Sequence, residues 1–249
     1  MPIIIKSDDE VEIMRHAGSV VAQTLQKLVD ALRPGLVEKE LDKIVRKEFD
    51  RHGVEPTFLG YHGYPATVCV SINDEIVHGI PGKRVIQEGD VVSLDLGCTY
   101  KGFVADSALT VIVGKAKPEA QKLVDVAKES LDAGIEQAHA GKKLGEISHA
   151  IQTYIESHGF GVVREYVGHG VGRQMHEEPQ VPNFGPPDRG PVLKKGMVLA
   201  LEPMVTVGDW HTRQLEDNWT VVTLDGSLAA HFEHTVAITE NGPEVLTVP

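Results

Sequence analysis

Apolar residues recur at helical spacing over the first fifty residues of the chain. Ser7 and Glu10 have the spacing of a capping box, in which each side chain bonds the backbone of the other at a helix start. We predict that the helix ends at Pro34 and Gly35, because both residues have poor helix propensity. Its apolar positions are Met14, Ala17, Val21, Leu25, Leu28 and Leu32. A second amphipathic helix is predicted over residues 37–52, with its apolar face and its terminal glycine at Leu41, Ile44, Val45, Phe49 and Gly53.

Segments rich in β-branched residues come next and predict strands. They are TVCVSIN at 67–73, DVVSLDLG at 90–97 and FVADSALTVIVG at 103–114. After Pro118 the same order begins again, with a long helix ending near Gly141 and a second helix ending at Gly159. Two helices followed by strands therefore occur twice in the chain.

The two halves of the chain also align position by position. The glycines at 35 and 53 are separated by 18 positions, as are those at 141 and 159, and Asp95 lies 107 positions before Glu202. A period this long indicates a duplicated half-domain and not a short solenoid repeat.

This duplication predicts the architecture. Two helices and a few strands cannot cover both faces of a sheet alone. We therefore expect an α+β fold in which the halves, about 7–114 and 118–249, merge into one curved antiparallel sheet backed by two pairs of helices. Residues 1–249 would form a single domain. About 20 additional residues in the second half are expected to lengthen its hairpin.

Acids occupy matching positions in the two halves. Asp95 and Glu202 each follow an apolar run, and each half continues into a strand that bears another acid, Asp106 or Glu233. Taken singly, such an acid is most simply a strand residue that faces water, and His169 a hydrogen-bonded residue of a glycine-rich loop. Because the arrangement is repeated in both halves, it favours a shared metal site.

Four carboxylates and one imidazole suit two divalent ions better than one, because carboxylates bridge and their charge needs about two dications to balance it. A carboxylate-rich ligand set favours Mn(II), Fe(II) or Co(II), and Zn(II) is also compatible with it. Such ions would activate a bridging water and polarise a carbonyl, which gives hydrolysis without a covalent intermediate. The serine motif GxSxG and the zinc motif HExxH do not occur.

The composition limits the partners. Twenty-four Lys and Arg against 36 Asp and Glu give a net charge of -12, so we expect neither a direct nucleic-acid partner nor a membrane partner. The start of the chain, MPIIIKSDDE, has too short an apolar run for a signal peptide, which favours a cytoplasmic location. Cys69 and Cys98 form no CxxC pair, so no disulfide framework or zinc ribbon is predicted. We expect a monomer.

Two motifs together with the metal-type residues resemble the type I methionine aminopeptidases in their short bacterial form. The motifs are GHGVGRQMHEEP at 168–179 and HGIP at 78–81. The resemblance covers nearly the whole chain and implies the pita-bread fold of that family. It also implies a set of metal ligands. Asp95 would hold one ion, and Asp106 and Glu233 would bridge both ions. His169 and Glu202 would complete the second.

The resemblance further implies the reaction. A hydroxide bridging two metal ions would attack the first peptide bond and release the initiator methionine from peptides and nascent chains whose second residue is small. His78 and His176 would be outer-shell catalytic groups that contact the substrate, and Glu202 would move a proton from water to the leaving amine. A transient contact with the ribosome would fit such a substrate.

A methionine pocket is implied as well. The residues at the family's pocket positions are Phe58, Tyr61, Tyr64, Cys69 and Trp219. His62, the repeat mate of His169, resembles a further active-site histidine of the family. Phe58 stands where the family often has a smaller residue, and Met175 stands where an aromatic residue is common.

Two other functions stay open at this point. Proline-directed relatives, aminopeptidase P and prolidase, usually carry an extra N-terminal domain, for which residues 1–6 leave no room. A non-catalytic pita-bread protein that binds partners would have missing ligands and basic patches, whereas here all five ligand positions are filled and the chain is acidic.

Overall fold

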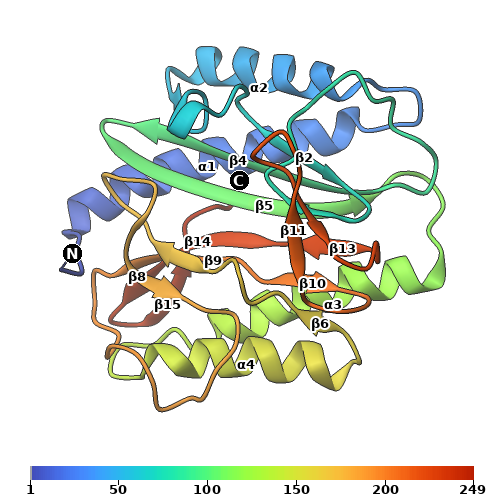
Figure 1. The fold of residues 1–249 in the computed structure, drawn as a ribbon. Coiled ribbons are helices and arrows are strands. Elements are labelled where there is room, and N and C mark those ends of the chain that lie inside the picture. The colour runs from blue at the N-terminus through green and yellow to red at the C-terminus, as the bar shows by residue number, and fades with distance from the viewer. Residues whose placement is uncertain (1) are drawn as a thin grey trace.

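Two pairs of helices pack against a curved sheet in the computed structural model, which describes residues 2–249 (Figure 1). The elements up to residue 112 are α1 (Asp8–Ala31), α2 (Glu38–His52), β1 (Glu55–Pro56), the 3-10 turn η1 (Tyr61–Gly63), β2 (Cys69–Ile72), β3 (Glu75–Val77), β4 (Val91–Tyr100) and β5 (Phe103–Ile112). The elements that follow are α3 (Pro118–Ile135), α4 (Leu144–Ser157), β6 (Gly161–Val162), β7 (Gly168–Gly170), β8 (Glu177–Val181), β9 (Val198–Leu201), β10 (Met204–Thr206), β11 (Thr212–Gln214), β12 (Val221–Thr223), β13 (Ala229–His231), β14 (Glu233–Thr239) and β15 (Gly242–Val245).

The helix limits follow from their caps. The predicted capping box is confirmed, because Glu10 N donates to Ser7 Oγ at 3.3 Å and Ser7 N donates to the Glu10 carboxylate at 3.0 Å. Helix α2 ends at Gly53, whose φ of 64° is easily adopted by glycine. Helix α3 is shorter than predicted. Its last turn tightens into bonds between residues three apart, such as Ala138 N to Ile135 O at 2.9 Å, and the chain leaves the helix before Gly141.

The sheet joins the first part of the chain to the second. Nine strands form it in the order β1-β4-β5-β14-β9-β7-β8, with β2 also paired to β4 and β15 to β14. The pairs within this sheet are antiparallel. Strands β5 and β14 therefore form the seam where the two sets of strands meet.

Each helix pair covers its own part of the sheet. Figure 1 shows α1 and α2 on one side of the seam and α3 and α4 on the other. One buried cluster joins α1 and α2 to β4 through Leu28, Phe49 and Leu94. A second joins α3 and α4 to β9 through residues that include Leu131 and Ile151. The predicted α+β class, a curved antiparallel sheet backed by two helix pairs, is confirmed. The division into halves at about 7–114 and 118–249 stays a prediction.

The additional residues of the second half do more than lengthen a hairpin. Strands β10 and β13 extend the β9–β14 hairpin, as expected. The remaining residues form β11 and β12, and β12 pairs with β3, a strand that precedes α3 in the chain, with Val221 opposite Val77. An edge strand such as β3 has unpaired backbone groups that accept another strand. This pairing brings Trp219 beside His78, with ring centres 6.2 Å apart.

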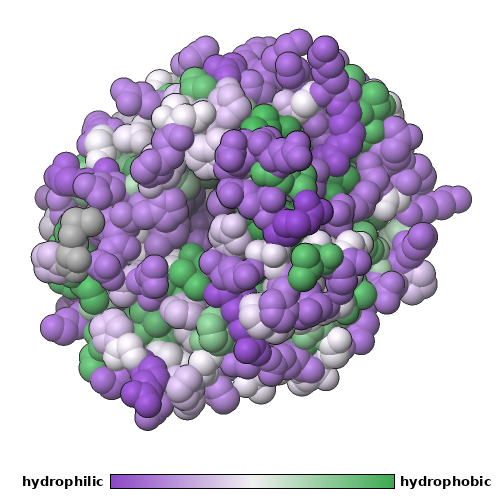
Figure 2. Space-filling view, in the orientation of Figure 1, coloured by the Kyte–Doolittle hydropathy of each residue, from purple (hydrophilic) through white to green (hydrophobic). Residues whose placement is uncertain are grey.

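The face of the molecule seen in Figure 2 is mostly hydrophilic, with scattered apolar positions and a shadowed hollow near its middle. Within residues 2–249, no helix combines the length and the apolar character needed to cross a membrane.

Candidate metal centre and adjoining pocket

Three of the predicted donors meet on the sheet. Asp106 on β5, His169 on β7 and Glu233 at the start of β14 each offer one ligand atom, and these atoms lie within 4.8 Å of one another. The strand register explains the meeting. Glu233 pairs with Ala108 of β5, and His169 pairs with Ala200 of β9, the neighbour of β14. The three side chains are buried.

The other two predicted donors adjoin this group. Glu202 follows β9 directly, and its Oε1 lies 3.5 Å from Nε2 of His169, which in turn lies 3.7 Å from Oδ2 of Asp106. Asp95 lies on β4, two residues before Gly97, and Gly97 pairs with Asp106 of β5. Because residues two apart in a strand face the same side, both aspartates face the same side of the sheet. All five side chains line one cavity.

Burial makes this group of acids difficult to ionise. It raises the pKa of Asp106 to about 6, and the negative charge of Asp106 adds to burial in raising the pKa of Asp95. The pKa values of Glu202 and Glu233 are also raised, first by burial and then by the neighbouring carboxylates. Burial lowers the pKa of His169 to about 4, so its imidazole is neutral at pH 7. The four acids therefore need a compensating positive charge.

Divalent cations fit these residues. Oδ1 of Asp95 and Oδ2 of Asp106 are buried without a hydrogen-bond partner among residues 2–249, a costly state for carboxylate oxygens. Nδ1 of His169 lies 3.0 Å from the Gly170 carbonyl, so it carries the hydrogen and leaves Nε2 as an acceptor facing the acids. The one hydroxyl hydrogen of Thr235 is shared between the Asp106 carbonyl, 2.8 Å from Oγ1, and Oδ1 of Asp106, 3.1 Å from Oγ1. This is how metal-ligating side chains are usually held from behind.

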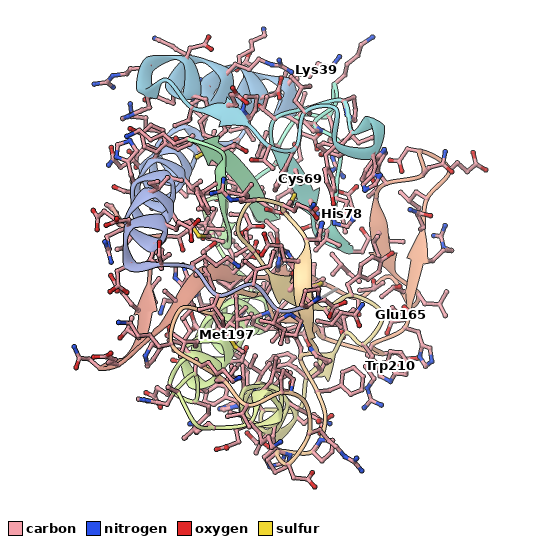
Figure 3. The ribbon with its side chains drawn as sticks, turned by 90° about the vertical axis from the view of Figure 1, so that its left-hand side faces the viewer. Lys39, Cys69, His78, Glu165, Met197 and Trp210 are labelled. Atoms are coloured by element: carbon pink, nitrogen blue, oxygen red, sulfur yellow. The ribbon has the colours of Figure 1, made fainter. Side chains whose placement is uncertain are left out.

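An apolar pocket adjoins the acids. Its wall contains Met175 and all of the predicted pocket positions, which are Phe58, Tyr61, Tyr64, Cys69 and Trp219. Figure 3 shows Cys69 and His78 near each other in the middle of the molecule. The cavity measures about 120 Å³. It is smaller than the roughly 300–1,000 Å³ of drug-sized sites.

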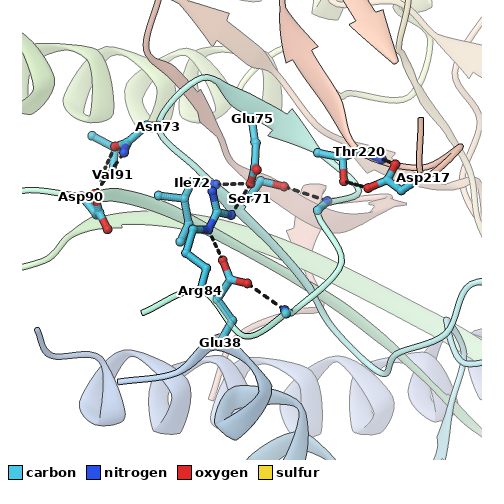
Figure 4. A network of polar contacts seen from close by, with 12 residues as sticks. Glu38, Ser71, Ile72, Asn73, Glu75, Arg84, Asp90, Val91, Asp217 and Thr220 are labelled. Atoms are coloured by element: carbon cyan, nitrogen blue, oxygen red, sulfur yellow. Dashed lines mark hydrogen bonds and ion pairs between the residues drawn. The ribbon is translucent and has the colours of Figure 1, made fainter. Parts of the chain in front are cut away.

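The two predicted catalytic histidines also line the cavity. His78 follows β3 with a φ of 63°, a conformation that is uncommon outside glycine. The loop after it is tied down by Arg84, which binds Glu38 of α2 and Glu75 of β3 (Figure 4). The ring centres of His176 and His169 lie 4.2 Å apart. Burial lowers the pKa of both His78 and His176 to about 4.

His62 is the one predicted site residue that does not line this cavity. Its ring stands edge-on to Tyr61 with centres 4.4 Å apart, and its charge contributes, after burial and His169, to lowering the pKa of His176. The repeat register led to His62, whose side chain is exposed, and its role in the site stays a prediction.

Sequence reasoning missed one residue of the site. His231 is buried, and its Nε2 lies 3.7 Å from Oε2 of Glu202 and lacks a hydrogen-bond partner among the described residues. The signal was present in HFEH, because a histidine two positions before Glu233 shares its side in an extended chain.

Known proteins are similar to this chain in sequence and architecture. The family model for metallopeptidase family M24 matches residues 12–240. A methionine aminopeptidase of Clostridium acetobutylicum is 52% identical over 99% of both chains, and methionine aminopeptidase 1 of Bacillus subtilis is 52% identical over 98% of this chain and 99% of its own.

Solved structures agree with these sequence relatives. Methionine aminopeptidase of Thermotoga maritima superposes with a TM-score of 0.98 at 48% identity over the whole of both chains. A prolidase of Pyrococcus furiosus superposes with a TM-score of 0.80 at 25% identity, over 99% of this chain and 66% of its own. The pita-bread fold expected from the sequence is confirmed. The chain therefore belongs to metallopeptidase family M24, and within it to the methionine aminopeptidases of bacterial type.

Proposed function

We propose that the chain removes the N-terminal methionine from peptides and nascent proteins whose second residue is small. The observation that carries this proposal is the cavity, which is lined both by five metal-type donors and by apolar side chains such as Phe58 and Trp219. An N-terminal residue seated there would bring its own peptide bond beside the donors. Relatives at 52% identity bear the name methionine aminopeptidase, which supports methionine as that residue.

We infer two divalent metal ions as cofactors, with Mn(II), Fe(II) or Co(II) favoured over Zn(II) by the carboxylate-rich donor set. Membership of a metallopeptidase family and the orphaned oxygens of Asp95 and Asp106 support bound cations. The residues that would hold them are Asp95, Asp106, His169, Glu202 and Glu233. Bound ions would supply an activated water and polarise the carbonyl of the first peptide bond.

The side chains of the pocket would bind and orient the substrate. Burial raises the pKa of Cys69, so its thiol is neutral and can contact an apolar thioether. Neutral His78 and His176 each have one N–H donor, the type of group that holds a scissile amide and the charge that develops on its oxygen. Glu202, whose pKa is raised among the acids, suits proton transfer from water to the leaving amine.

The same proposal includes the setting of the reaction. Nascent chains emerge in the cytoplasm, so we place the protein there, as a monomer with a transient ribosome contact. The net charge of -12 supports the absence of direct binding to nucleic acid or to a membrane surface.

Paired substrates test the proposal. Metal-stripped protein would be loaded with Mn(II), Fe(II) or Co(II) and offered Met-Ala-Ser and Ala-Pro-Ser at equal concentration. We expect metal-dependent release of free methionine from the first peptide and little cleavage of the second. Absence of methionine under all three metals, or preferential cleavage of the proline peptide, would overturn the proposal. The variant D188N, at an exposed loop position, serves as a control that keeps full activity.

A further inference from the structure

A hydrogen bond crosses the candidate pocket between two distant segments. The Tyr61 hydroxyl lies 2.7 Å from Nδ1 of His176, although 115 positions separate the two residues in the chain. Their rings are inclined by 34° with centres 5.5 Å apart, and both line the cavity. At this distance the contact is a well-formed O–H···N hydrogen bond.

The turn that carries Tyr61 fixes where its hydroxyl lies. Gly60 N donates to Tyr64 O at 2.8 Å, and Gly63 N donates to Gly60 O at 3.0 Å. Gly60 and Gly63 have φ of 83° and 90°, which glycine adopts without strain. The ring of His62 packs against the edge of Tyr61. The phenol is therefore presented from a closed, hydrogen-bonded turn.

The direction of this bond decides which nitrogen of His176 carries a hydrogen. A neutral imidazole has one N–H and one bare nitrogen. Nδ1 of His176 is the one hydrogen-bond acceptor that the Tyr61 hydroxyl has within residues 2–249. If the phenol donates to Nδ1, the ring hydrogen lies on Nε2. Within residues 2–249 the hydrogen bond of this ring is the one at Nδ1, and the ring lines the cavity, so Nε2–H is available to a bound molecule.

We propose that Tyr61 is a positioning residue whose hydroxyl donates to Nδ1 of His176 and holds that ring as the Nε2–H tautomer, with this N–H directed at the bound peptide bond. The inference rests on the proposed function, which supplies the peptide. Tyr61 then has two separable roles, because its ring forms part of the pocket wall and its hydroxyl sets the donor. Without the hydroxyl, both tautomers and more ring orientations become accessible, and the N–H is delivered for only part of the time.

Kinetics of Y61F separate these two roles. Phenylalanine keeps the ring in the wall and removes only the oxygen. For release of methionine from Met-Ala-Ser by the metal-loaded enzyme, we expect kcat to fall about 10- to 100-fold, by analogy with the loss seen when the hydrogen-bond partner that orients a metal-ligating side chain is removed. KM should change by less than about twofold, because the wall is intact. A role in the wall alone predicts an unchanged kcat, and that result would overturn the proposal.

Two further variants sharpen the kinetic test. Y61F added to H176A should lower kcat no further than H176A alone, since the hydroxyl acts through that ring. Additive losses would contradict the proposal. Y154F is the matched control, because it removes a tyrosine hydroxyl bonded to Glu129 on an exposed surface, and its kcat and KM should equal those of the wild type.

The tautomer itself is measurable without activity. In the full chain labelled with ¹⁵N-histidine, metal-free or loaded with diamagnetic Zn(II), the His176 signals are those that disappear in H176A. We expect a protonated Nε2 and a bare Nδ1 at pH 7.5 in the wild type, and averaged signals in Y61F. A protonated Nδ1 in the wild type, or an unchanged spectrum in Y61F, would overturn the proposal. Failure of the wild type to release methionine would instead count against the proposed function.

Discussion

Asp106 lies at the centre of the buried acids, and its carboxylate is the clearest source of pH dependence. Burial raises its pKa to about 6, above the ordinary value of 3.8. In the metal-free protein the folded state therefore keeps a proton between these pH values that the unfolded state has lost. The free energy of unfolding contributed by Asp106 falls as pH rises through this window and stays low above it.

We therefore predict that D106N stabilises the metal-free protein at pH 8, by about 1–3 kcal/mol, because the amide has no charge to bury. At pH 4 the difference should vanish, since the wild-type carboxyl is protonated. Urea unfolding at the two pH values measures this. D106N should also lose most of the stabilisation that added Mn(II) gives the wild type. A destabilised D106N at pH 8 would contradict this account, and D188N, at an exposed position, should behave as wild type at both pH values.

At the scale of elements, the segment before α1 is tied to the loop that carries His176. Lys6 Nζ lies 2.7 Å from Oε2 of Glu177, the first residue of β8, with side chains 2% and 4% exposed. Oε1 of the same carboxylate accepts a hydrogen bond from Gln174 N at 3.2 Å. Because this ion pair is buried, losing one partner leaves a charge without compensation.

We predict that K6M lowers the free energy of unfolding by about 3–5 kcal/mol. The double variant K6M/E177L should regain a large part of this loss, since neither charge then remains in the interior. Urea denaturation followed by circular dichroism compares the two. An equal loss in the double variant would show that shape, and not the unpaired carboxylate, causes the effect.

The elements also show what the sequence could predict. Periodicity located all four helices, and the repeat led to Asp95, which lies in β4, and to Glu202, which follows β9 directly, because the apolar neighbours of each fix the register of that strand. The crossing of β12 to β3 was beyond reach, since it depends on which edge is free after the sheet has formed. The bond from Tyr61 to His176 was equally hidden, because it joins two loops through a turn that no periodicity describes.

At the scale of the whole molecule, β5 and β14 carry the connection between the two helix pairs. Side-chain hydroxyls cross this seam in both directions. Thr235 Oγ1 donates to Asp106 O at 2.8 Å, and Ser107 Oγ donates to Glu233 O at 2.6 Å. The backbones of two proposed metal ligands are thus held by the opposite strand. A bound cation would strengthen the same connection, because its ligands come from both sides of the seam.

This coupling predicts how the protein unfolds. T235V leaves the buried Asp106 carbonyl without its donor and should lower the free energy of unfolding by about 1–3 kcal/mol, whereas T235S keeps the hydroxyl and should lose less.

Metal present at about 100 times its dissociation constant should add roughly 2.7 kcal/mol to the free energy of unfolding of the wild type. Tryptophan fluorescence, which reports on residues 210 and 219 of the second half, and circular dichroism of all four helices should follow one transition with and without metal. If metal shifted the fluorescence transition and left a separate dichroism transition behind, the seam would not couple the two sides, because ligands drawn from both β5 and β14 must stabilise both together.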